Sequence, residues 1–114
     1  KIIFLGVVYK NNTSDYKYAK EFEIFEKINK KFNADFYDEN IKIIKSNNKS
    51  KKRINLKNIN RYPSIVLTNS ISNKLFKTIE KKLLKQKNKY ILNLSRYNLD
   101  KNIIMFNLIE EPLK

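Results

Sequence analysis

The stretch at residues 2–9, IIFLGVVY, decides the fold class. It is a nearly continuous run of apolar, β-branched and aromatic residues. Such a run is typical of a central strand that is buried on both faces, because a half-exposed strand would alternate apolar with polar side chains. We therefore expect residues 2–9 to form the centre of a sheet, and the other elements to be arranged around this strand.

Two amphipathic helices are predicted after strand-like segments. Residues 15–32 repeat apolar side chains at spacings of 4, 3, 3 and 4, which places them on one helix face. Polar residues at 11–15 and 69–72 supply side-chain oxygens that can cap the two helix starts. The two apolar stripes consist of Tyr18, Phe22, Phe25, Ile28 and Phe32 in the first helix, and Leu75, Phe76, Ile79 and Leu83 in the second.

Three further strands are predicted at residues 34–45, 62–68 and 90–94. The basic stretch at 46–53 lies between the first two of them and is predicted to be an exposed loop. The last apolar segment, at 103–109, is interpreted as an extra edge strand or a tail that docks on a neighbour.

The predicted order of elements is therefore β-α-β-β-α-β followed by an extension. This order is typical of the ferredoxin-like fold of the α+β class, in which two helices cover one face of a four-stranded antiparallel sheet. We expect one ferredoxin-like domain at residues 1–97 and a C-terminal extension at 98–114.

The charge of the chain is concentrated in its middle. The 114 residues carry 25 Lys and Arg against 11 Asp and Glu, a formal charge of +14. Residues 1–40 hold seven bases and seven acids, and residues 90–114 hold three of each. Residues 41–89 hold fifteen bases and one acid, Glu80. An A+T-rich coding sequence would explain the 22 lysines, but not the absence of acids from this block, which predicts a polyanion-binding surface.

The bases of this block are placed on the predicted hairpin between the second and third strands and on the second helix. Ammonium and guanidinium groups beside Asn and Ser side chains are suited to phosphate oxygens and to the RNA 2′-hydroxyl. The candidate RNA-binding residues are Lys45, Lys49, Lys51, Lys52, Arg53, Lys57, Arg61, Lys74, Lys77 and Lys81.

Catalysis is not expected. The chain has no cysteine and no histidine, which excludes disulfides, thiol nucleophiles and histidine general bases. Asp35, Asp38 and Glu39 form the densest carboxylate cluster, which we interpret as a polar turn rather than a cation site. We therefore expect no enzyme activity, metal, cofactor or small-molecule substrate. No apolar run approaches the ~18 residues of a membrane span, so no membrane partner is expected either.

Residues 62–69, YPSIVLTN, resemble the second half of the bacterial-type small-subunit ribosomal protein six family when taken with Ile79-Glu80 and Ile91-Leu92 further on. The resemblance spans residues 2–97, although the glycine and the Leu-x-Tyr-Pro-Ile run of that family's hairpin are missing. It implies a structural protein of a ribosomal small subunit that binds rRNA beside a protein-eighteen-like neighbour. The implied setting is a mitochondrial or other organellar ribosome, with a cytoplasmic ribosome of an A+T-rich organism as the alternative.

A second resemblance leads to the alternative function. Residues 18–22, YAKEF, follow the first strand and are similar to the opening of the thioredoxin-like mitochondrial ribosomal and complex I subunit family. That resemblance implies a non-catalytic assembly subunit of another large complex.

Overall fold

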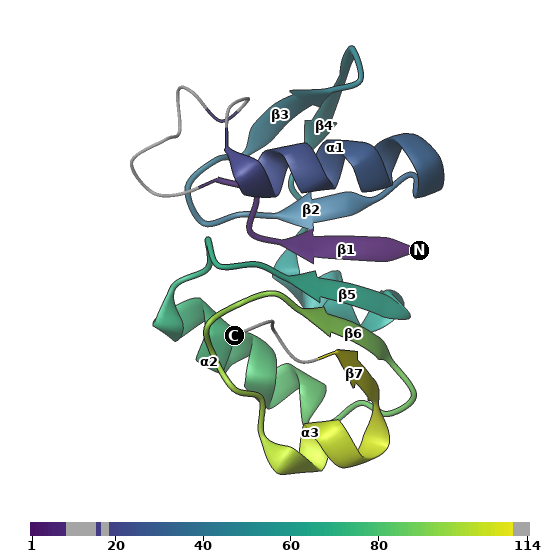
Figure 1. Ribbon diagram of the computed structural model, residues 1–114, viewed down its shortest axis with the longest axis vertical. Coiled ribbons are helices and arrows are strands. Elements are labelled where there is room, and N and C mark those ends of the chain that lie inside the picture. Colours follow the sequence, from purple (N-terminus) through teal and green to yellow (C-terminus); the bar gives the residue numbers. More distant parts are fainter. Residues whose placement is uncertain (9–15, 17–18, 111–114) are drawn as a thin grey trace.

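The computed structural model describes residues 1–8, 16 and 19–110 of the chain. Within them, none of the helices is long and apolar enough to cross a membrane. The elements, labelled in Figure 1, are β1 (Ile2–Leu5), α1 (Lys20–Phe32), β2 (Asp35–Tyr37), β3 (Ile43–Ser46), β4 (Lys49–Lys52), the 3-10 helix η3 (Leu56–Arg61), β5 (Ser64–Leu67), α2 (Asn73–Leu83), β6 (Tyr90–Asn93), α3 (Lys101–Phe106) and β7 (Leu108–Glu110).

The main sheet has five strands in the order β2-β1-β5-β6-β7, and every neighbouring pair is parallel. The β1 strand lies inside the sheet, where Ile3 is paired with Asp35 on one side and with Ile65 on the other. This confirms the prediction of a central strand. The chain adds strands first on one side of β1 and then on the other, which is the doubly wound order of α/β domains.

The predicted ferredoxin-like antiparallel sheet is wrong. Parallel strands that follow one another in the chain need a crossover of a dozen or more residues, and residues 38–63 provide it, leading from β2 past β1 to β5. The basic stretch at 46–53, which we expected to be a loop, lies inside this crossover. It forms the turn and the second strand of the antiparallel hairpin β3–β4, and η3 follows the hairpin. The hairpin turns at Asn47 and Asn48, whose φ angles are 54° and 65°. Asparagine tolerates this left-handed conformation, which two-residue hairpin turns require.

Helices cover the two faces of the sheet unequally. On one face α1 packs against Phe4 of β1 and Phe36 of β2, and Phe25 contacts both rings edge to face at 5.4 and 5.9 Å. On the other face η3, α2 and α3 pack against the alternate strand residues, such as Ile3 and Ile65. The lysine-bearing elements η3 and α2 therefore lie on the face opposite α1.

Candidate nucleic-acid interface

In a doubly wound sheet, ligands usually bind beyond the carboxyl ends of the strands, where the strand order reverses. Here that point lies between β1 and β5, and the two following loops are in close contact. Gly6 has a φ of 98°, and a Cβ atom at this position would lie 2.6 Å from Oγ1 of Thr68. The Thr68 hydroxyl donates a hydrogen bond of 2.9 Å to the Gly6 carbonyl. The contact leaves little room between these two loops.

Asp38 satisfies the backbone donors at this edge. One carboxylate oxygen accepts hydrogen bonds from the amides of Val7 at 2.7 Å and Val8 at 3.0 Å. The other oxygen accepts from the amides of Asn40 at 2.7 Å and Ile41 at 3.2 Å. Burial raises the pKa of Asp38, and these four bonds counteract that rise. An anionic ligand would need the same N–H groups, so the geometry does not favour a phosphate site here.

The other two carboxylates of the acidic cluster have separate partners. Asp35 accepts a 2.5 Å hydrogen bond from the hydroxyl of Tyr62, whose pKa is raised above its usual range by burial and by this carboxylate. Glu39 binds the backbone amide of Ser72 at 2.9 Å and its hydroxyl at 2.8 Å, at the start of α2. In the part of the chain that the structure describes, no group of three or more acidic, His or Cys residues could hold a metal ion.

Two of the predicted RNA-binding residues have partners inside the fold. The Lys51 ammonium donates to Asn29 at 3.0 Å and to the Ala34 carbonyl, and lies 3.7 Å from Asp35. The Arg53 guanidinium donates to the Asp38 carbonyl at 2.9 Å and packs over the ring of Tyr37. These groups attach β4 and the crossover to the neighbouring elements, so they are poorly placed for phosphate.

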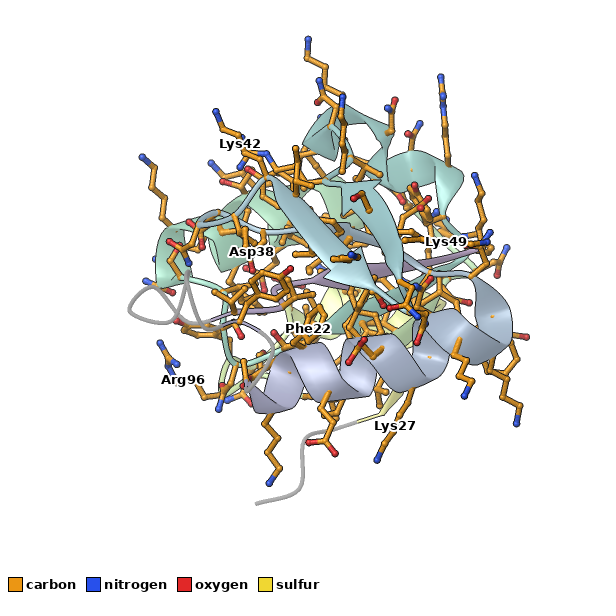
Figure 2. The ribbon with its side chains drawn as sticks, turned by 90° about the horizontal axis from the view of Figure 1, so that it is seen from above. Phe22, Lys27, Asp38, Lys42, Lys49 and Arg96 are labelled. Atoms are coloured by element: carbon orange, nitrogen blue, oxygen red, sulfur yellow. The ribbon has the colours of Figure 1, made fainter. Side chains whose placement is uncertain are left out.

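The remaining candidates on the hairpin are open to solvent. Lys45, Lys49 and Lys52 are exposed, and Figure 2 labels Lys49 beside the hairpin strands and Asp38 inside the molecule. Lys45 and Lys52 lie on one face of the hairpin and form a first basic surface, whereas Lys49 belongs to the other face, with Ser46 and Ile44.

A second basic surface is a groove between η3 and the C-terminal half of α2, which we call the lysine groove. It has a volume of about 420 Å³, and none of the described residues that line it is acidic. The one acid of this block, Glu80, accepts a hydrogen bond from the amide of Asp100 before α3. The lining residues are Lys57, Ile59, Asn60, Lys81, Lys82, Lys85 and Gln86.

Lys89 holds one wall of the lysine groove in place. Its buried ammonium donates hydrogen bonds to the carbonyls of Asn60 at 2.8 Å and Tyr62 at 2.6 Å, and burial lowers its pKa. These bonds fix the end of η3 against the start of β6. Lys89 is therefore a structural residue rather than a ligand for phosphate.

The structure brings together only part of the predicted set. Lys57 and Lys81 line the lysine groove, while Lys74, Lys77 and Arg61 are exposed on the same two elements. Sequence reasoning did not select Lys82 and Lys85, although Lys77, Lys81 and Lys85 recur every four residues. Lys77 and Lys81 lie one turn apart on α2, and Lys85 follows at the same spacing in the turn after the helix, so the pattern could have identified Lys85.

No protein-family model matches the chain, and no curated protein or solved structure matches it. The function is therefore inferred from the geometry and charge of the site.

Proposed function

We propose that this protein is a non-catalytic RNA-binding protein that holds the phosphate backbone in the lysine groove. The observation that carries the proposal is that four lysines, from η3, from α2 and from the turn after α2, surround one groove with no acid among its described lining residues. Their ammonium groups repel one another, and a bound polyanion relieves this repulsion while its own counterions are released.

The basic surface is longer than a single anion requires. From the lysine groove it continues along α2 to Lys77 and Lys74, and Arg61 is exposed at the end of η3. Contacts of this kind position a nucleic acid without reading its sequence. The exposed lysines of the hairpin provide a second point of attachment.

Amide side chains in the lysine groove favour RNA over DNA. Asn60 and Gln86 line it together with the lysines. The side chain of Asn60 is exposed there and can hydrogen-bond to a ribose 2′-hydroxyl, a group that deoxyribose lacks.

The biological setting that we propose is rRNA in a ribosomal small subunit, with an organelle as the compartment and neighbouring ribosomal proteins as further partners. The parallel sheet differs from the topology that the ribosomal resemblance implied, so support for RNA binding comes from the lysine groove alone. Co-sedimentation of the protein with ribosomal particles in a sucrose gradient tests this setting separately.

Replacing Lys57, Lys81 and Lys85 together with glutamine is expected to lower affinity for a single-stranded uridine oligonucleotide. The loss should be about 100-fold near 0.1 M salt, because each lost charge removes roughly 0.7 of a released counterion. Fluorescence anisotropy with a labelled oligonucleotide measures the change.

The matched control replaces Lys20, Lys30 and Lys31, which are exposed on α1 on the other face. The net charge changes equally, but we expect less than about threefold loss, because distant exposed charges are largely screened. Equal losses in the two triple variants would show that the lysine groove has no special role.

A further inference from the structure

A second groove lies on the opposite face of the sheet. Parallel sheets are normally covered by helices on both faces. On this face α1 covers β2 and β1, whereas β5 and β6 extend beyond it and have no described helix over them (Figure 1). The uncovered area contains a hollow of about 270 Å³, which we call the apolar groove. Its lining includes Ile2, Ile28, Phe32, Val66, Tyr90 and Leu92.

The apolar groove exposes large side chains to water. Phe32 at the end of α1 is 58% exposed, and Tyr90 at the start of β6 is 59% exposed. Leu92 and Ile28 are half-buried between them. Clustered exposure of this kind marks an interaction surface. Among the described helices, none continues the α1 layer over β5 and β6, so an added helix would complete this layer.

The charges beside the apolar groove indicate the character of that helix. The Lys31 ammonium lies 5.5 Å from the ring centroid of Phe32, at the end of the groove where α1 ends. The Lys1 ammonium lies 4.0 Å from Asp35 and over the ring of Tyr62, which packs on the other face, so Lys1 adds no charge to this groove. Lys27 is exposed one turn earlier on α1 and is partly neutralised by Glu23 at 3.5 Å. A second copy of the chain would bring the same lysines together, whereas an acidic partner would be attracted.

We propose that the apolar groove binds an amphipathic helix of a partner protein, with acidic residues where the helix passes Lys31 at the end of α1. Apolar side chains of the partner enter the hollow between α1 and β6. This surface lies on the face opposite the lysine groove, so both could be occupied at once. The proposal does not depend on RNA binding.

Two labelled model helices test the proposal by fluorescence anisotropy with the full chain. Both present the same leucine face, and one carries glutamate and the other lysine on its flanks. The acidic helix should bind at least tenfold more tightly, and Lys31→Glu should reduce that preference. Phe32→Asp and Tyr90→Asp should each weaken its binding at least tenfold, whereas Leu84→Asp, at a 46% exposed position at the end of α2, should not.

Three outcomes would overturn the proposal. The first is the absence of saturable binding of the acidic helix to the native protein. The second is equal affinity for the acidic and basic helices. The third is concentration-dependent dimerisation that Phe32→Asp abolishes, since the occupant would then be a second copy. RNA affinity should be unchanged in Phe32→Asp, which separates this proposal from the lysine groove.

Discussion

Asp38→Ala is expected to lower the free energy of unfolding by about 3–5 kcal/mol, since each buried amide left without an acceptor costs about 1–3 kcal/mol. The side chain is 1% exposed, and its carboxylate accepts hydrogen bonds from four backbone amides. The amides of Val7 and Val8 lie deepest and would lose their acceptor without access to water. Urea denaturation followed by circular dichroism measures the change.

Two comparison variants separate this network from a general effect of losing an acid. Asp38→Asn keeps one acceptor oxygen, so its loss should be smaller than that of the alanine variant. Asp100→Ala removes a carboxylate that accepts from the amide of Asn102 at the start of α3, and should cost about 1 kcal/mol. Similar losses for Asp38→Ala and Asp100→Ala would contradict the role assigned to Asp38.

Gly6→Ala is expected to lower the free energy of unfolding by about 2–4 kcal/mol. A left-handed backbone costs an alanine roughly 1–2 kcal/mol, and overpacking costs about 1–3 kcal/mol. The φ of Gly6 is 98°, and the new Cβ would lie 2.6 Å from Thr68 Oγ1 and 3.0 Å from a methyl carbon of Ile71. The same denaturation experiment gives the value.

A double variant tests the cause of that loss. Thr68→Ala removes the hydroxyl that the new methyl group would meet, so Gly6→Ala should cost less in this background than in the native protein. The backbone strain should remain. Strictly additive effects would show that the contact between the two loops does not set the cost.

The sequence predicted elements better than it predicted their pairing. The buried run at residues 2–8, the apolar stripe of α1 and that of α2 are visible as patterns, because each reflects burial of a local face. Whether neighbouring strands run parallel depends on the crossovers, and the crossover at 38–63 contains a short hairpin and a 3-10 helix instead of an α-helix. A basic hairpin at this place in the chain resembles the connection between the second and third strands of a ferredoxin-like sheet. This resemblance led to the wrong prediction of an antiparallel topology.

The candidate site was predictable at the level of the segment but not of the individual side chain. The scarcity of acids in residues 41–89 indicated the segment that supplies the lining of the lysine groove, but the groove itself was not predicted. Counting charges could not show that Lys51, Arg53 and Lys89 bind carbonyl oxygens within the fold. These partners lie on either side of β2 and at the end of η3, so they depend on the tertiary structure.

The salt dependence of RNA binding tests the central claim most directly. Affinity for a uridine oligonucleotide is measured from low to high salt for the native protein, the lysine-groove variant and the α1 control. We predict a linear decrease of log affinity with log salt, with a slope that is smaller by about two in the lysine-groove variant and unchanged in the control. Affinity independent of salt, or the same slope in all three proteins, would contradict the account.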